Sequence, residues 1–192
     1  MMLCRLKQLN KQEGGFTLIE LIIGVVLASL IGIAVAMTLV LMFKVSADSS
    51  HRVTAIRQVQ NAGMWITQDV QSAQTITIGG SHFLEVLWAD WGGTKHKVDY
   101  DYDPLVTSDL TRKYYIKHIA DTDYVLTSQT VVAHYIDSSM DTSINPQKAK
   151  TRVEQSGGIY TLTVTATITG FSANGQPISE TRTYEILSRS SG

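Results

Sequence analysis

Residues 11–32 read KQEGGFTLIELIIGVVLASLIG, and this stretch decides how the chain begins to fold. Two glycines, Gly14 and Gly15, precede a long apolar run, and a single acidic residue, Glu20, lies inside it. No charged side chain occurs from residue 21 to residue 43. A helix of that length spans roughly 35 Å, enough to cross a hydrocarbon core of about 30 Å. The stretch therefore predicts a membrane-crossing helix.

The apolar run differs from an ordinary secretory signal. A signal has an apolar core of roughly 7–15 residues followed by a small-residue cleavage site. Here the core is longer, and the pair of small residues comes before it. Arg5, Lys7 and Lys11 outnumber the single acid Glu13 in the leader. This positive leader predicts a cytoplasmic N-terminus, with the polar remainder of the chain on the outer side.

Small residues recur along one face of the predicted helix. Gly24, Ala28, Gly32 and Ala36 are spaced four apart, and Glu20 lies four residues before Gly24. Small residues in this register let another membrane helix approach closely. A carboxylate in a bilayer is costly and usually faces a protein partner or water. Glu20 is therefore expected to face the same neighbour as the small residues, or else to lie at the cytoplasmic headgroups.

The string GFTLIE at residues 15–20, followed by the apolar helix, resembles the N-terminal motif of type IV pilin and pseudopilin precursors. The resemblance implies that a membrane prepilin peptidase cuts between Gly15 and Phe16 and methylates the new N-terminus at Phe16. It also implies that Glu20 pairs with the positively charged N-terminus of an adjacent subunit during filament assembly. Opposite charges that neutralise each other in a low dielectric would fix the stagger of the two helices.

Many major pilins carry a proline in the membrane helix and a disulfide-bounded loop near the C-terminus, and two departures from this pattern favour a minor pilin or pseudopilin. The apolar helix holds no proline, and Cys4 is the only cysteine, so no internal disulfide forms. The order of predicted strands and the tyrosine-rich middle also resemble minor pseudopilins of the J type and pilus-initiating minor pilins. The resemblance leaves open whether the machine is a type IV pilus, a type II secretion system or a competence apparatus.

The sequence divides into four parts. We expect a leader at residues 1–15, a transmembrane and assembly helix at 16–45, an amphipathic helix at 46–74 and an extracytoplasmic β-rich domain at 75–192. The polar residues 46–50 suggest a joint between the two helical parts. The expected location is the inner membrane, crossed once, and then a pilus or pseudopilus.

The second helical part shows an apolar stripe at three- and four-residue steps, which predicts a helix laid against a sheet. The stripe consists of Val53, Ile56, Val59, Gly63, Ile66, Val70 and Ala73. The opposite, polar face is assigned Arg52, Gln58, Gln68, Asp69 and Gln71. Trp65 falls off the stripe and is expected at an edge or a subunit contact.

Strand patterns follow the helix and predict an α+β fold with antiparallel strands. Strands are expected at 75–78, 82–88, 94–102, 110–119, 160–169 and 179–187, with a hairpin turn at Asn174-Gly175. Residues 124–136 are interpreted as a strand followed by a helical turn. Residues 137–155 are polar and are interpreted as a long loop.

The sequence shows no catalytic motif, so the chain is not expected to be an enzyme. No histidine stands in an H-E-x-x-H arrangement, and each is expected at a surface or an edge; they are His51, His82, His96, His118 and His134. No metal site is predicted from these residues.

Three alternating aspartates match the start of a calcium-binding EF-hand loop. They are Asp99, Asp101 and Asp103, but Pro104 and Leu110 stand where the loop needs a glycine and a glutamate. The match to an EF-hand therefore fails, and solvated strand-end aspartates are the expectation. A looser calcium site near the three aspartates is a lesser alternative.

Two classes of function remain. The first is a structural filament subunit, whose partners are the prepilin peptidase, other pilin or pseudopilin subunits, the inner-membrane assembly platform and the lipid bilayer. The second is an extracellular binding or sensory domain that keeps its leader as an unprocessed single-pass anchor. A net charge of −1 gives no basic surface for nucleic acid, so no nucleic-acid partner is predicted.

Overall fold

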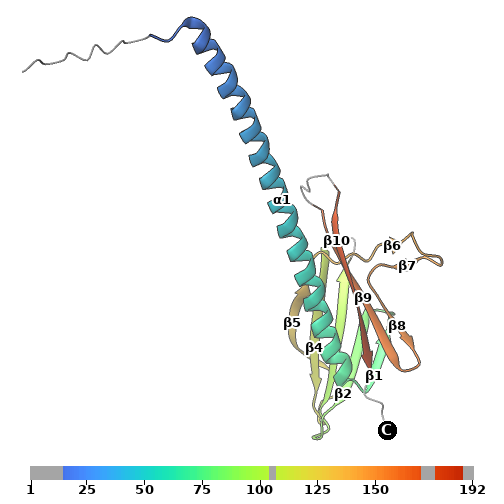
Figure 1. The fold of residues 1–192 in the computed structure, drawn as a ribbon. Coiled ribbons are helices and arrows are strands. Elements are labelled where there is room, and N and C mark those ends of the chain that lie inside the picture. Colours follow the sequence, from blue (N-terminus) through green and yellow to red (C-terminus); the bar gives the residue numbers. More distant parts are fainter. Residues whose placement is uncertain (1–14, 104–106, 170–175, 188–192) are drawn as a thin grey trace, which may run out of the picture. The chain divides into compact units, whose positions relative to one another are not determined.

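The structure is a computed structural model that describes residues 15–103, 107–169 and 176–187 (Figure 1). It contains one long helix, α1 (Leu18–Ser72), followed by strands that pair in antiparallel sheets. The chain divides into two compact units, Met1–Phe43 and Lys44–Gly192, and α1 contributes to both. The predicted α+β class, with a long apolar N-terminal helix, is confirmed.

In the first unit, α1 begins at Leu18 and exposes its apolar side chains on every side. By length and composition the helix could cross a membrane, with a mean hydropathy of 2.7 over its most apolar window. A membrane span and an N-terminal signal sequence both fit such a helix. The apolar side chains of this segment pack against no core within the described part of the chain.

In the second unit, α1 continues without a break to Ser72, so residues 46–50 are helical. Its inward face buries Ala55, Val59, Ala62, Gly63, Ile66, Asp69 and Val70. Two predictions of helix face are wrong: Val53 is 45% exposed, and Asp69 is only 5% exposed. Asp69 can be buried because its carboxylate pairs with an arginine on the sheet, whose side chain is 14% exposed, as described below.

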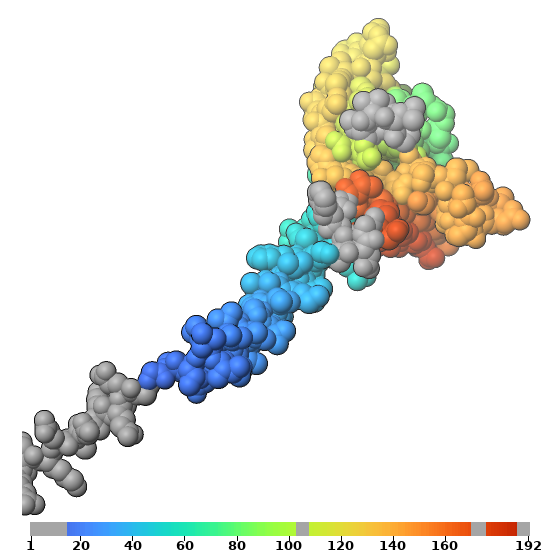
Figure 2. Space-filling view, turned by 90° about the horizontal axis from the view of Figure 1, so that it is seen from above, coloured from blue at the N-terminus to red at the C-terminus, as the bar shows by residue number. Residues whose placement is uncertain are grey.

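The larger sheet has five antiparallel strands in chain order. They are β1 (Thr75–Ile78), β2 (Leu84–Ala89), β3 (Lys95–Asp103), β4 (Thr107–Lys117) and β5 (Val125–Ala133). A second sheet has the order β10 (Ile178–Leu187), β9 (Ile159–Ile168), β8 (Arg152–Ser156). The short strands β6 (Met140–Asp141) and β7 (Lys148–Ala149) pair with each other. The segment that holds them, orange in Figure 2, projects from the rest of the second unit.

The hydrophobic core of the second unit is shared by α1 and both sheets. Helix residues such as Val59 and Ile66 join Leu84 and Val98 of the larger sheet and Leu162 of the smaller one. In β2 and β3 every second residue faces this core, as Leu84 and Val86 do, which explains the alternation in these strands. The core therefore holds the helix from Ala55 to Val70 against the sheets.

Gly63 is needed where α1 meets β10. A Cβ added at Gly63 would lie 2.2 Å from Cζ of Tyr184. The Tyr184 hydroxyl donates a hydrogen bond to the carbonyl of Val59, one turn earlier, at 3.2 Å. The tyrosine ring thus fills the space that any other side chain at position 63 would take.

Most strand predictions are confirmed, with ends shifted by a few residues. Two are wrong: residues 124–136 contain β5 without a helical turn, and residues 137–155 contain β6, β7 and most of β8. β8 was hidden because only Val153 is apolar in its RVEQS sequence, and this side chain packs on the core. The Asn174-Gly175 turn lies outside the described residues, while β9 and β10 pair antiparallel as a hairpin requires.

Candidate functional site

The start of α1 is fixed by a capping box formed by Thr17 and Glu20. The Glu20 Oε2 accepts hydrogen bonds from the Thr17 backbone N–H and hydroxyl, both at 2.9 Å. In return, the Glu20 N–H donates to the Thr17 hydroxyl oxygen at 3.3 Å. These reciprocal bonds satisfy groups that a helix N-terminus otherwise leaves unpaired. The T-x-x-E spacing was visible in the sequence, but its capping role was missed.

The capping box leaves Glu20 accessible to a further partner. The carboxylate is exposed, and both capping bonds go to one of its two oxygens. An ionised carboxylate accepts about four hydrogen bonds. Glu20 can therefore cap its own helix and still accept a donor from another chain.

The predicted small-residue face is exposed along one uninterrupted stretch of helix. Gly24, Ala28, Gly32 and Ala36 are all exposed, and a Cβ added at Gly24 or Gly32 would meet nothing within 4 Å. We call Glu20 with these four residues the assembly face. Gly15 and Phe16 precede the helix and are exposed as well. Cleavage between them and pairing through Glu20 stay predictions.

A buried ion pair joins the helix to the larger sheet. The guanidinium of Arg112, on β4, binds Asp69 through Nε at 2.7 Å and Nη2 at 2.9 Å, and the Tyr100 hydroxyl donates to the same carboxylate at 2.5 Å. The guanidinium also lies 5.1 Å from the Trp65 ring, which places Trp65 beside the core. The two charges can lie away from water because each is paired with the other and hydrogen-bonded, which offsets the cost of desolvation.

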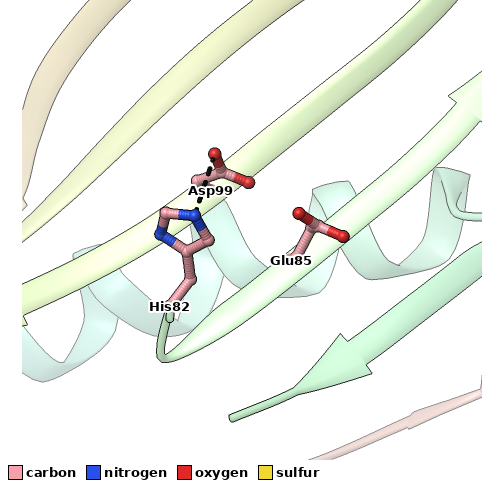
Figure 3. A group of neighbouring side chains, drawn as sticks. All are labelled: His82, Glu85 and Asp99. Atoms are coloured by element: carbon pink, nitrogen blue, oxygen red, sulfur yellow. Dashed lines mark ion pairs between the residues drawn. The ribbon is translucent and has the colours of Figure 1, made fainter. Parts of the chain in front are cut away.

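Ionisable side chains gather on the face of the larger sheet that points away from the core. We call His82, Glu85, Lys97, Asp99 and Asp101 the outer cluster; Figure 3 shows three of them. Glu85 on β2 stands directly opposite Asp99 on β3, and His82 lies two residues before the start of β2. His82, Glu85 and Asp99 each offer an atom within 4.8 Å of the others.

Hydrogen bonds and ion pairs link every member of the outer cluster. The His82 Nδ1 lies 2.6 Å from Asp101 Oδ1, and its Nε2 lies 3.6 Å from Asp99 Oδ2. The Lys97 Nζ bridges Glu85 Oε2 at 2.9 Å and Asp99 Oδ2 at 3.1 Å. Lys113, on β4, binds the other oxygen of Asp101 at 2.8 Å.

Asp99 is the most enclosed member, with 1% of its surface exposed. Burial raises the pKa of its carboxyl group, while Lys97 and His82 act in the opposite direction. Its Oδ1 is buried and has no hydrogen-bond partner among the described residues. The expectation that these aspartates face solvent is therefore wrong for Asp99, which is covered by its charged neighbours.

The remaining predicted candidates occupy separate places. Asp103 ends β3, but its side chain lies outside the described residues, so the calcium alternative stays untested there. His96 forms a group of three near-parallel rings with Trp88 and Tyr114, whose centroids lie 5.2 and 6.0 Å from its own. His134 is half exposed and lies 2.7 Å from Asp109. Sequence spacing could not reveal the outer cluster, because strand pairing brings its members together.

Comparisons with models of protein families, with characterised proteins and with solved structures gave no match. The architecture itself, a long apolar N-terminal helix followed by antiparallel β-sheets, is pilin-like.

Proposed function

We propose that this chain is a minor pilin or pseudopilin, a structural subunit of a type IV pilus-like or type II secretion filament. One observation carries the proposal: the GFTLIE string spans the start of a helix that exposes Glu20 and four small residues on one face. The pilin-like architecture of helix and sheets supports it. The chain's role is assembly, and it performs no chemical reaction of its own.

The mechanism follows from the assembly face. A prepilin peptidase removes the leader between Gly15 and Phe16 and methylates Phe16, which leaves a positive charge at the helix start. The apolar helix holds the subunit in the bilayer until the assembly platform extracts it. Gly24 and Gly32 let a neighbouring helix approach, and Glu20 accepts the neighbour's N-terminal ammonium. Pairing the two charges removes the cost of holding either alone in lipid.

A second candidate is an unprocessed, membrane-anchored extracellular binding or sensory domain. The capping box favours it, since Thr17 gives Glu20 a role within its own chain. In that case the apolar helix serves as a permanent anchor, and residues 1–15 stay attached.

The test is the intact mass and the N-terminal residue of the chain isolated from its native membranes. We expect a chain that begins at methylated Phe16 and lacks residues 1–15. A Gly15→Val variant should keep its leader, whereas Gly14→Ala should be processed, because the cut falls after residue 15.

Cleavage of the leader does not by itself show that the chain enters a filament. The same membranes are therefore sheared, and the filament fraction is collected. The proposal expects the processed chain in that fraction. A chain that still begins at Met1 while the host peptidase processes another substrate would instead establish the anchored domain.

A further inference from the structure

We propose that the outer cluster is a binding site for a divalent metal ion of the zinc class, with His82, Glu85 and Asp99 as protein ligands. Nothing in the filament role requires this site. One nitrogen and two carboxylate groups converge there, with ligand atoms within 4.8 Å of one another. Figure 3 shows Asp99 lying between the other two side chains.

The separation of His82 and Asp99 fits metal ligands better than it fits a hydrogen bond. Their Nε2 and Oδ2 atoms lie 3.6 Å apart, which is too long for a good hydrogen bond. Two ligands about 2.1 Å from a tetrahedral zinc ion are separated by about 3.4 Å. A shift of a few tenths of an ångström would therefore place both atoms on one ion.

Asp101 prepares His82 for this role. Its Oδ1 lies 2.6 Å from the His82 Nδ1, so the carboxylate accepts a hydrogen bond from Nδ1–H. That bond selects the tautomer whose Nε2 carries a free lone pair, and Nε2 is the atom directed at Asp99. Metal-binding histidines are commonly oriented by a carboxylate in this way.

Asp99 supplies an independent sign of a missing partner. The residue is 1% exposed, and its buried Oδ1 makes no hydrogen bond within the part of the chain described. Buried carboxylate oxygens are almost always paired, because leaving one without a partner is unfavourable. A cation held by both oxygens of the Asp99 carboxylate would give Oδ1 a partner, while Oδ2 faces His82.

Lys97 occupies the place of the cation when no metal is bound. Its Nζ contacts both Glu85 and Asp99, so it neutralises the same two carboxylates as a divalent ion would. A lysine ammonium is a compact charge on a flexible stem and can swing into water. The metal and Lys97 therefore compete, and removing the lysine should strengthen metal binding.

The ligand set selects the type of metal. An imidazole with two carboxylates suits zinc and neighbouring transition metals, whereas calcium takes six to eight oxygen ligands. Three protein ligands also leave room for a water molecule on the ion. The site thus differs in ligands and in metal from the calcium alternative based on the aspartates alone.

The experiment titrates zinc chloride into the full chain in detergent, after chelator treatment, by isothermal calorimetry. All variants carry Cys4→Ser, which removes the only thiol. We expect one zinc ion per chain, a rise in unfolding temperature with zinc and no such response to calcium. His82→Gln should abolish binding, and Asp101→Asn should weaken it about 10- to 100-fold.

Lys97→Met provides the decisive variant, because a merely structural lysine would not make metal binding tighter. We expect about tenfold tighter zinc binding, equivalent to about 1.4 kcal/mol. His134→Gln is the matched control, since His134 also pairs with an aspartate but lies apart from the outer cluster; its zinc affinity should equal that of the parent. Unchanged or weaker binding in Lys97→Met, or zinc binding that survives His82→Gln, would overturn the proposal.

Discussion

Asp137 shows how a single carboxylate organises a polar segment. Its carboxylate accepts two hydrogen bonds from Ser139, one from the backbone N–H at 2.9 Å and one from the hydroxyl at 2.6 Å. It accepts a third from the Thr167 hydroxyl at 2.9 Å. Lys150 adds an ion pair at 2.9 Å. Burial raises the pKa of this carboxyl group, but the four donors outweigh burial and lower the pKa to about 2. The segment after β5 is thereby tied to β9.

The lowered pKa predicts a defined loss of stability in acid. An unfolded aspartate has a pKa of about 3.9, so the stabilisation is present above about pH 4 and is lost as pH falls toward 2. Asp137→Asn should lower the free energy of unfolding near pH 7 by up to about 2 kcal/mol. Thermal unfolding of the chain in detergent between pH 7 and pH 2 measures this, and parent and variant should converge at the acid end.

Asp141→Asn is the control for this prediction. Asp141 accepts the same pair of bonds from Ser143, at 2.9 and 2.6 Å, but lies on the surface. Its replacement should have a smaller effect at pH 7. Equal effects from both variants would show that the local turn, rather than the bonds to Lys150 and Thr167, provides the stability.

Asp69 marks a limit of sequence reasoning at the residue scale. Helical periodicity placed it on the polar face, beside Gln68. Its partner Arg112 lies 43 positions away, so no local sequence pattern could predict that the two side chains form an ion pair. The same limit hid the outer cluster, whose members meet only through the register of β2 and β3. The residues of the assembly face, by contrast, lie within about five turns of one helix, so their common face could be predicted from their spacing in the sequence alone.

At the scale of elements, the assembly face of α1 gives a prediction that separates folding from association. Gly32→Leu should leave the fold unchanged, because nothing lies within 4 Å of the added Cβ. It should reduce association between copies, because a leucine keeps two helix backbones apart. Co-purification of two differently tagged copies from membranes measures association, and thermal unfolding measures the fold.

Ala34→Leu provides the matched control, since Ala34 is another exposed small residue on the same helix but lies off the assembly face. We expect co-purification in this variant to equal that of the parent. If Gly32→Leu also leaves association unchanged, the helix does not pack through its small residues.

The elements differ in how far the sequence determined them. The apolar run predicted α1 and strict alternation predicted β9, because each has a long periodic pattern, and β10 was predicted as the strand that returns after the Asn174-Gly175 turn. β8 lacked such a pattern: it is held by pairing with β9, where Val153 stands opposite Leu162. Short strands formed mainly through a partner therefore escape reasoning from their own residues.

At the scale of the whole molecule, the buried core belongs to one of the two units. Among the described residues, every buried hydrophobic side chain lies between Ala55 and Ile186, within Lys44–Gly192. The helix up to Phe43 contributes none of them. The second unit therefore holds the contacts that a domain needs to fold, while the described part of the first unit is an exposed apolar helix.

This division predicts that a fragment of residues 44–192 folds alone, whereas one of residues 75–192 does not. The shorter fragment loses Val59, Ile66 and Val70, whose burial contributes about 4 to 9 kcal/mol. That is comparable to the total stability of a domain, about 5–15 kcal/mol. It also removes Asp69, the ion-pair partner of Arg112. Circular dichroism and heating should show cooperative unfolding for the longer fragment only. Failure of residues 44–192 to fold would mean that the apolar helix supports the domain, contrary to the distribution of the core.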